Sequence, residues 1–318
     1  MSVIYNLRSG KNTKAFYYMR CVLRQIIPSL FYRLQRNGVL RKCEQREDID
    51  YMRDRVDYYN KLQNHYVLDD TAKSIRELRK GGASSSYFYD TVEIARWFQK
   101  QRRISIDWGD VTYIPKQPSI VKSRPIDGDN ANSVVLKLDK IRHFLFVKDS
   151  RLWHDKNNRV IFRGKVPGKE KRIRFFNMYF GNPMCDLGDT SRNGNIEWQT
   201  GKRTLEEQLK FKFILALEGN DVASNLKWIM SSGSIAIMPR PEYETWFMEG
   251  RLIPNVHYIE IKRDFSDLEE RINYYLLHES ESLAIIRNAN EYVAQFMNPR
   301  REKLISLMVL NKYLSKTE

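Results

Sequence analysis

The fold class is decided by residues 210–228, which read KFKFILALEGNDVASNLKW. An apolar run of strand length enters a polar turn, and the pattern predicts a helix that begins at Asn220-Asp221. Further apolar runs of strand length occur at Val160-Ile161-Phe162, at 234–238 and at 257–261. Strands that alternate with helices from residue 160 to residue 280 predict an α/β unit with a parallel sheet.

The length of 318 residues suits two domains of ordinary size. We expect residues 1–148 to form an N-terminal α/β domain and residues 149–318 a C-terminal α/β domain that ends in closing helices. Two such units facing a cleft would be doubly wound and would bind ligands at the carboxyl ends of their strands. The spacing also predicts one long helix from Asp48 to Arg79 and a capping box of Ser266 with Glu269.

The charge balance is strongly basic, with 54 Lys and Arg against 39 Asp and Glu and a net charge of +15. Such an excess attracts nucleic acid, anionic lipid or phosphorylated sugars. The first 42 residues contain nine basic residues, no acid and many apolar side chains, a composition that suits either an anionic membrane surface or an ordinary solvated face. The nine are Arg8, Lys11, Lys14, Arg20, Arg24, Arg33, Arg36, Arg41 and Lys42.

Several classes of protein are disfavoured by what the sequence lacks. It has no GxGxxG, GxxxxGK[ST], GxSxG or HExxH motif, which argues against dinucleotide oxidoreductases, P-loop enzymes, α/β-hydrolases and zinc peptidases. Its three cysteines have neither metal-ligand spacing nor the number for a disulfide framework. No apolar run suggests a signal peptide or a membrane span, so we expect a cytoplasmic protein, with peripheral membrane contact left open.

Polar chemistry gathers where the predicted strands end. Asp107 and Asp110 follow the short strand around Ile106, where a carboxylate can act as a general base, although a turn aspartate gives the same pattern. Arg163-Gly164 follows the strand at 160–162, and the basic residues Lys169, Lys171, Arg172 and Arg174 come next. An arginine there can hold a phosphate, while the alternative is a solvated basic face.

Five groups of residues carry a resemblance through their order and spacing. They are Phe162-Arg163-Gly164, Lys210-Phe211-Lys212, the turn at 218–227, Gly233-Ser234, and 252–258 together with 264–268. In this order they resemble glycosyltransferase family 90, the lipopolysaccharide-modifying and Rumi-type group. The resemblance covers residues 104–297, is thin before residue 100, and is greater to the short bacterial branch.

The resemblance implies a GT-B fold of two Rossmann-like domains and inverting transfer of a hexose from a UDP-sugar, with no metal or other cofactor. Residues 1–148 would then form the acceptor-side domain and residues 149–318 the domain that binds the nucleotide sugar. Asp110 matches the catalytic aspartate in a segment of the form I-x-x-x-D-x-x-x-[IV]-P, from Ile106 to Pro115. The residues implied to bind the donor are Arg163, Gly164, Lys212, Asp221, Val222, Ala223, Ser224, Asn225 and Lys227. The sequence departs from the family at Asn225, where Rumi-type members have a second phosphate arginine, and Lys227 is the substitute we expect.

The partners that the resemblance implies are a UDP-sugar donor and a lipopolysaccharide core acceptor. The basic N-terminal segment adds an anionic membrane surface, here the inner membrane, as an expected partner. Further candidates for the acceptor side of the cleft are Asp107, Trp108, Arg124, Glu242 and His257. A basic nucleic-acid-binding protein is the alternative from another class, and it explains the charge but not the polar turns at strand ends. A lipopolysaccharide sugar kinase is a second alternative, disfavoured because the phosphate loop and metal carboxylates are missing.

Overall fold

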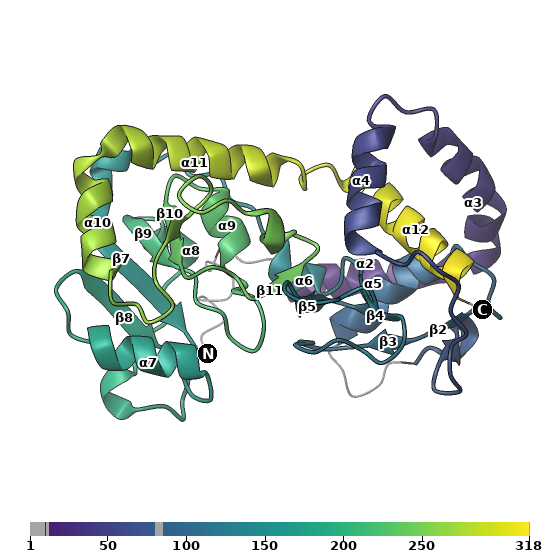
Figure 1. The fold of residues 1–318 in the computed structure, drawn as a ribbon, viewed down its shortest axis with the longest axis horizontal. Helices are drawn as coiled ribbons and strands as arrows, with labels where there is room; N and C mark the ends of the chain where they lie inside the picture. The colour runs from purple at the N-terminus through teal and green to yellow at the C-terminus, as the bar shows by residue number, and fades with distance from the viewer. Residues whose placement is uncertain (1–9, 11–12, 80–84, 318) are drawn as a thin grey trace. The chain divides into compact units, whose positions relative to one another are not determined.

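The computed structural model describes residue 10, residues 13–79 and residues 85–317, and it divides into two compact units (Figure 1). Unit 1 is built mainly from Arg142–Pro241 and Glu249–Gln295, and unit 2 mainly from Lys14–Ile141, Glu242–Met248 and Phe296–Glu318. From Lys14 the chain therefore runs through unit 2 and then unit 1, returns briefly to unit 2 at Glu242–Met248, and ends in unit 2 with its last helix. The division of roles between an acceptor-side and a donor-side domain stays a prediction.

Unit 1 contains the parallel sheet that the alternating pattern predicts. Its five strands lie in the order β12-β10-β9-β7-β8, and every neighbouring pair is parallel. If the five strands are numbered 1 to 5 in chain order, from β7 to β12, their order in the sheet is 2-1-3-4-5, starting at the edge strand β8. This order is found in doubly wound sheets. The strands are β7 (Asn157–Gly164), β8 (Cys185–Asp189), β9 (Phe211–Leu215), β10 (Ile235–Met238) and β12 (Ile259–Glu260).

Successive strands are added on opposite sides of β7, so the strand order of the sheet reverses between β7 and β9. From β7 it moves outward to β8, and it then crosses back to β9 and proceeds to β10 and β12 on the other side. The connections that leave the carboxyl ends of β7 and β9 therefore diverge, and side chains or ligands can enter between them. This switch point places the loop after Gly164 beside the turn after Leu215.

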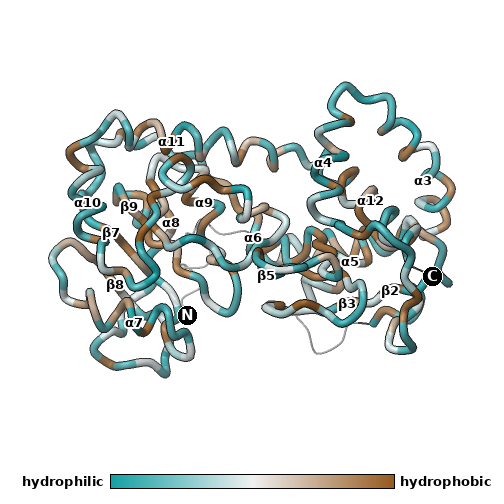
Figure 2. The backbone as a smooth tube through the Cα atoms, in the orientation of Figure 1, coloured by the Kyte–Doolittle hydropathy of each residue, from teal (hydrophilic) through white to brown (hydrophobic). Residues whose placement is uncertain are grey.

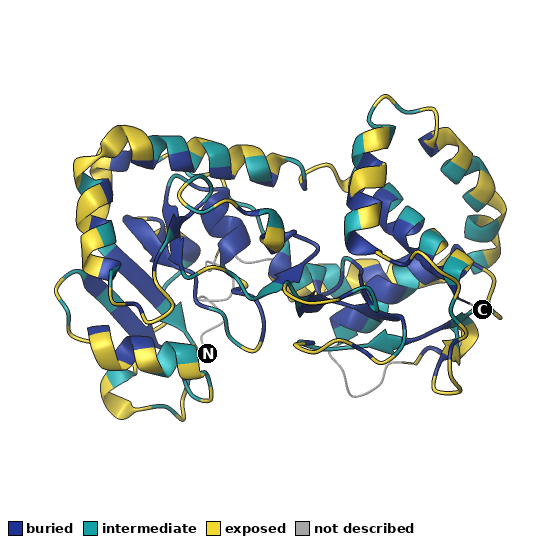
Figure 3. Ribbon diagram, viewed as in Figure 1, coloured by how far each residue is buried: buried dark blue, intermediate teal, exposed yellow. Residues whose placement is uncertain are grey.

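Both faces of the central strands are covered. On one face of the sheet, Val160 and Phe162 of β7 belong to a buried core that also contains residues of α7 and α10. Ile161 lies on the opposite face and is fully buried as well. The near-continuous apolar runs of these strands follow from burial on both faces, as Figures 2 and 3 show for the sheet of unit 1. The helices of this unit are α7 (Glu170–Tyr179), α8 (Leu205–Gln208), α9 (Leu226–Met230), α10 (Leu268–Leu277) and α11 (Glu279–Ala294).

Unit 2 is also an α/β structure, with a smaller parallel sheet. Its three strands have the order β3-β4-β6, namely β3 (Ile106–Asp107), β4 (Ser119–Val121) and β6 (Ser133–Val135). Two antiparallel pairs accompany it: β1 (Lys73–Ser74) with β2 (Arg103–Ile104), and β5 (Ser123–Pro125) with β11 (Tyr243–Thr245). Its helices are α2 (Lys14–Ile26), α3 (Ser29–Cys43), α4 (Ile49–Tyr59), α5 (Ser85–Ala95), α6 (Lys140–His143) and α12 (Pro299–Lys316).

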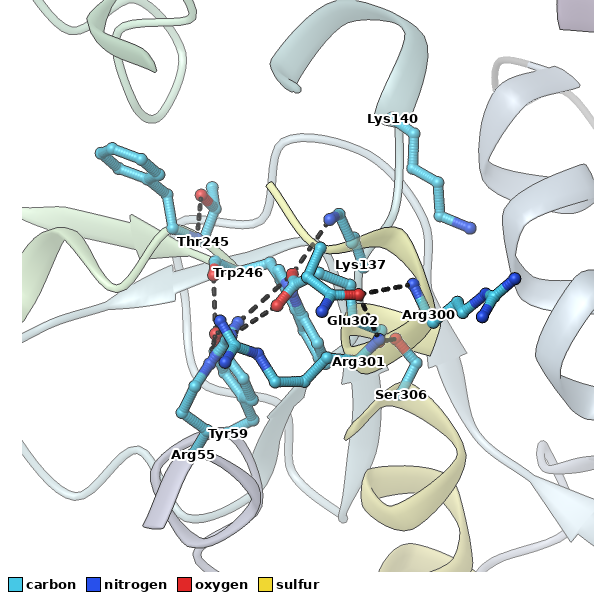
Figure 4. Close-up of polar contacts among 12 residues, drawn as sticks. Arg55, Tyr59, Lys137, Lys140, Thr245, Trp246, Arg300, Arg301, Glu302 and Ser306 are labelled. Atoms are coloured by element: carbon cyan, nitrogen blue, oxygen red, sulfur yellow. Dashed lines mark hydrogen bonds and ion pairs between the residues drawn. The ribbon is translucent and has the colours of Figure 1, made fainter. Parts of the chain in front are cut away.

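A buried polar cluster attaches the C-terminal helix α12 to the rest of unit 2 (Figure 4). Glu302 of α12 forms an ion pair with Arg55 of α4, whose guanidinium also donates to the hydroxyl of Tyr59 at 2.7 Å. Lys137 Nζ and Trp246 Nε1 donate to Oε2 of Glu302 at 3.0 Å and 2.6 Å. Burial by itself would raise the pKa of Glu302, but the charges of Lys137 and Arg55 outweigh burial and lower it.

The structure corrects three local predictions. The long helix expected over Asp48–Arg79 ends at Tyr59, because the Asn60 side chain accepts the N–H of Leu62 at 3.1 Å and diverts the backbone from the helix. The helix expected from Asn220-Asp221 begins only at Leu226. The Ser266 capping box does not form, since the Ser266 hydroxyl donates to Asp264 at 2.8 Å.

Candidate active site

The switch point of unit 1 is lined by two glycines and one arginine. A Cβ on Gly164, the last residue of β7, would lie 2.8 Å from the ring of Phe162, and one on Gly219 would lie 3.0 Å from Nη2 of Arg172. Glycine at 219 therefore leaves room for the Arg172 guanidinium, and glycine at 164 leaves room for the Phe162 ring on which the guanidinium lies. Arg172 comes from the first turn of α7, the helix that follows β7.

The Arg172 guanidinium joins the two loops at the switch point. It donates to the carbonyl oxygen of Lys165 at 2.8 Å in the loop after β7, and to those of Leu217 at 2.8 Å and Glu218 at 3.2 Å in the turn after β9. It also lies over the ring of Phe162, with Cζ 5.3 Å from the ring centroid. For the basic residues after β7, the sequence left open a purely solvated face. These contacts show that Arg172 is not part of such a face.

Arg172 is a cation with only neutral partners. Among the residues that the structure describes, no carboxylate forms an ion pair with it, and burial lowers its pKa to about 10. It nevertheless stays charged at neutral pH. Arg172 is half-buried, and a partly desolvated cation that is bound only by carbonyl dipoles favours an anionic ligand, since an anion would offset the cost of desolvation.

The neighbouring basic residues of this segment also reach the turn after β9. Lys171 Nζ lies 2.5 Å from a carboxylate oxygen of Glu218, and Lys169 Nζ donates to the side-chain oxygen of Asn220. The carboxyl edge of the sheet between β7 and β9 is therefore cationic. A diphosphate is a suitable ligand for such an edge, because its oxygens accept hydrogen bonds and carry the complementary charge.

Arg163, the donor arginine expected from the sequence, already has a carboxylate partner. Its guanidinium donates to the main-chain oxygen of Asp186 at 2.7 Å and forms an ion pair with the side chain of Asp186 at 2.5 Å. Burial lowers the pKa of Arg163 more than Asp186 raises it. Its Nε has no hydrogen-bond partner among the described residues, so one donor is unused.

The two lysines expected at the donor site lie elsewhere in unit 1. Lys212 is near the amino end of β9, away from the carboxyl edge, with Nζ over the Trp153 ring at 5.0 Å. Lys227 is fully buried in α9, where it forms an ion pair with Glu249 at 2.5 Å. The structure thus does not bring either lysine to Arg172.

Residues 221–224 form a non-helical loop before α9, which begins at Leu226. Asp221, Val222 and Ala223 are buried, and Ser224 is exposed. The Asn225 side chain donates to the Leu215 carbonyl at 3.0 Å and so holds the turn against the end of β9. Burial of Val222 and Ala223 explains why the helix begins later than the local pattern predicts.

The carboxyl edge of the parallel sheet in unit 2 contains a second polar group of residues. Asp110 follows β3 and Lys122 follows the adjacent β4, and their side chains form an ion pair at 2.5 Å. The Tyr87 hydroxyl donates to the same carboxylate oxygen at 3.2 Å. Lys122 is almost fully buried, whereas the Asp110 side chain is 21% exposed, so the carboxylate is both oriented and accessible.

Asp107 and Trp108 precede Asp110 in the chain by three and two residues. Asp107 is in β3 and accepts a long hydrogen bond from the Tyr113 hydroxyl at 3.4 Å. The indole of Trp108 packs edge-on against Phe88, and its buried Nε1 has no hydrogen-bond partner among the described residues. The indole N–H is therefore an unused donor two residues from Asp110.

Three further candidates have structural partners. Arg124 is fully buried, forms an ion pair with Glu244 at 2.7 Å and donates to backbone carbonyls, including that of Ser133 at 3.0 Å. The main-chain oxygen of half-buried Glu242 accepts the N–H of Ile126 at 2.9 Å. His257 Nδ1 accepts the Ile253 N–H at 2.9 Å, and burial lowers the pKa of its imidazole.

Sequence reasoning missed Arg172 as a site residue and missed Lys122 altogether. Arg172 lay in a basic run that was noted but could not be separated into solvated and buried members. Lys122 directly follows the apolar Ile120-Val121, the same signal of a polar residue after a strand that singled out Asp110. Within the described residues, no group of three or more His, Cys, Asp or Glu side chains could hold a metal ion.

Comparison with known proteins identifies the family. The model of "Glycosyl transferase family 90" matches residues 134–316, more than half of the chain. The chain belongs to glycosyl transferase family 90 and is a glycosyltransferase.

Individual relatives agree with this assignment. The chain is 42% identical over 265 residues to "O-glucosyltransferase LpsA" of Dichelobacter nodosus, a match that covers 83% of each protein. It is 26% identical over 170 residues to human "Protein O-glucosyltransferase 3", which covers 51% of this chain and 32% of the human protein. The family resemblance inferred from the ordered motifs is confirmed, as is the prediction of an enzyme.

Proposed function

We propose that the protein transfers a hexose from a UDP-sugar and that unit 1 binds the donor diphosphate at the switch point between β7 and β9. The observation that carries the proposal is Arg172, a half-buried cation that contacts three backbone carbonyls and forms no ion pair with a described carboxylate. A diphosphate bound there would gain charge-assisted hydrogen bonds. As the bond to the sugar breaks, negative charge grows on the UDP, and a preorganised cation stabilises that charge.

We propose that Asp110 of unit 2 is the general base. The acceptor hydroxyl oxygen forms a bond to C1 of the sugar while the bond from C1 to the β-phosphate oxygen breaks. The hydroxyl proton goes to Asp110, and the electron pair of the broken bond leaves with UDP, so that the configuration at C1 is inverted. Lys122 and Tyr87 orient the Asp110 carboxylate through the contacts at 2.5 Å and 3.2 Å, and act as positioning residues.

The proposed acceptor is a hydroxyl of a lipopolysaccharide core or a related glycan. Support comes from the similarity to a protein named O-glucosyltransferase LpsA over 83% of both chains. We propose Trp108 as an acceptor-binding residue, because it lies two residues before Asp110 in the chain and its indole N–H has no hydrogen-bond partner among the described residues. A sugar hydroxyl is the kind of acceptor group that such a donor binds.

The remaining features of the proposal are a GT-B arrangement, cytoplasmic location and no requirement for metal. In this scheme Arg172 and Lys171 of α7, together with Lys169 directly before this helix, supply the positive charge that a divalent ion would otherwise provide. Arg163 is proposed as an additional donor contact through its unused Nε, provided that its ion pair with Asp186 persists.

The direct test is a donor screen read by UDP release. The purified full chain is incubated with UDP-glucose, UDP-galactose and UDP-N-acetylglucosamine, each with and without a lipopolysaccharide core oligosaccharide and each with and without EDTA. We expect acceptor-dependent UDP release with one hexose donor, unchanged by EDTA. No acceptor-dependent release with any of the nucleotide sugars would reject the proposed donor class, and complete loss in EDTA would reject the metal-independent mechanism.

A further inference from the structure

The first two described helices of unit 2 expose large apolar side chains to solvent. We call six of them the exposed apolar stripe: Phe16, Leu23 and Ile26 of α2, and Leu30, Phe31 and Leu34 of α3. All six are more than half exposed, and the values reach 73% for Ile26 and 72% for Leu34. The side chains recur at intervals of three, four and seven residues, so they form a continuous face on each helix.

The opposite face of α2 is attached to unit 2 by polar contacts. The Tyr17 hydroxyl donates to Asp90 at 2.7 Å, and Arg24 forms an ion pair with Glu93 at 2.7 Å, both on α5. Arg96 donates to the carbonyl oxygens of Arg24, at 2.5 Å, and Ile27. An ordinary surface helix buries its apolar face and exposes its polar face, and α2 has the reverse orientation.

The same reversal continues in α3. Its inward side chains are Tyr32, which packs edge-on against Trp97 at 5.1 Å, and Arg36, which lies over Phe98 at 5.2 Å. The outward side chains are Leu30, Phe31 and Leu34, and Figure 3 shows the exposed outer side of α3 in yellow. Because the inward contacts fix both helices, the stripe is a built surface and does not result from loose packing.

We propose that α2 and α3 bind to the surface of an anionic lipid bilayer, with the exposed apolar stripe inserted at the level of the headgroups. From Lys14 to Cys43 the chain has seven basic residues and no acidic one. Of these, Lys14, Arg20, Arg41 and Lys42 are exposed. An apolar face flanked by cationic side chains is the pattern of helices that lie in a membrane interface.

Charge selects lipid over a second copy of the chain. A symmetric dimer through the stripe would bring two acid-free basic segments together, and their like charges would repel. An anionic membrane removes that repulsion and buries the same apolar area. In the part of the chain that the structure describes, no helix is long and apolar enough to cross a bilayer, so the contact we propose lies on the surface.

Membrane binding would bring unit 2 to an acceptor carried by a membrane, and in this one respect it rests on the proposed function. Binding itself requires neither donor nor acceptor. The basic residues Arg8 and Lys11, included in the expectation from the sequence, lie outside the described residues.

The test is flotation of the full chain with vesicles of phosphatidylcholine alone or of phosphatidylcholine with phosphatidylglycerol. The triple variant Ile26→Ser, Leu30→Ser and Leu34→Ser should lower the partition coefficient by about tenfold or more on anionic vesicles. A charge variant, Arg20→Gln with Lys42→Gln, should remove most of the preference for anionic over neutral vesicles and most of the salt dependence.

The matched control is Val67→Ser, Ile196→Ser and Leu277→Ser, a triple change at apolar residues that are 83–89% exposed outside the stripe. It removes equally exposed apolar side chains, and we expect wild-type flotation. The proposal is overturned if the wild-type chain does not float, if both triple variants float as it does, or if both lose binding equally. It is also overturned if lipid-free chain dimerises at assay concentrations and only the stripe variant abolishes the dimer.

Turnover on a soluble acceptor separates this inference from the proposed function. Neither triple variant should change UDP release in that assay, because none of the substituted residues contacts the proposed site. A chain that binds vesicles through the stripe but releases no UDP with any donor supports the membrane inference and rejects the proposed enzymatic reaction.

Discussion

Replacing Arg172 with methionine should weaken UDP binding by about 2–3 kcal/mol, or roughly 30- to 150-fold in Kd. Methionine keeps much of the aliphatic stem over Phe162 and removes the charge. The magnitude follows from two quantities. A hydrogen bond to a charged group contributes about 1.5–3 kcal/mol. Burial that lowers the pKa of the guanidinium from 12.5 to about 10 corresponds to a desolvation cost of about 3 kcal/mol, which a bound phosphate would partly offset.

Calorimetry with two ligands separates phosphate binding from changes in the shape of the site. UDP and uridine share the base and ribose, so Arg172→Met should weaken UDP binding and leave uridine binding nearly unchanged. Arg174→Met is the matched control, because Arg174 is exposed on the same helix and donates to the Arg263 carbonyl oxygen away from the switch point. Thermal unfolding of each variant shows whether it is folded, since Arg172 also joins the two loops.

Two results would refute the reasoning. If folded Arg172→Met binds UDP within twofold of the wild type, the diphosphate does not bind at this switch point. If UDP and uridine lose affinity equally, Arg172 shapes the turn after β9 and does not contact phosphate.

Three other predictions concern unit 2. Asp110→Asn should lower turnover by about 10²–10⁴-fold with donor affinity nearly unchanged, whereas Asp107→Asn should have far less effect; equal effects of the two on turnover would contradict the assignment of the base. Glu302→Gln should destabilise unit 2 by about 3–5 kcal/mol in denaturant unfolding, because Arg55 and Lys137 would then be buried without a counter-charge; a change below about 1 kcal/mol would show that the cluster contributes little. The pKa of Glu302 is lowered on folding, so its contribution is present above the unfolded value of about 4.5 and lost as the pH falls below it; wild-type stability measured from pH 6 to pH 3 should therefore decline more steeply than that of Glu302→Gln.

Several features of this protein could be predicted from local sequence. The apolar run at 211–215 and its polar turn indicated a strand of a buried parallel sheet, and the structure confirms this. The order of the motifs indicated the family, and the comparisons confirm it. These predictions succeeded because hydrophobic periodicity and turn chemistry are properties of neighbouring residues.

Local patterns were less informative where a side chain has partners distant in sequence. The pattern at 220–230 predicted an early helix, but burial of Val222 and Ala223 delays it to Leu226. The resemblance implied Lys227 as a substitute phosphate ligand; in the structure its side chain pairs with Glu249 in the core, and its role at the donor stays a prediction. No periodicity in the sequence reports such contacts, because they depend on which elements pack together.

The sequence by itself determined that strands and helices alternate, that polar residues follow the strands, and that the chain is a glycosyltransferase of family 90. Only the tertiary structure decided which of those polar residues meet. Arg172 reaches Leu217 and Glu218 because the strand order places β7 beside β9, and Asp110 reaches Lys122 because β3 lies beside β4. Strand order arises from long crossover connections and from burial on both faces of the sheet, neither of which is present in a local stretch of sequence.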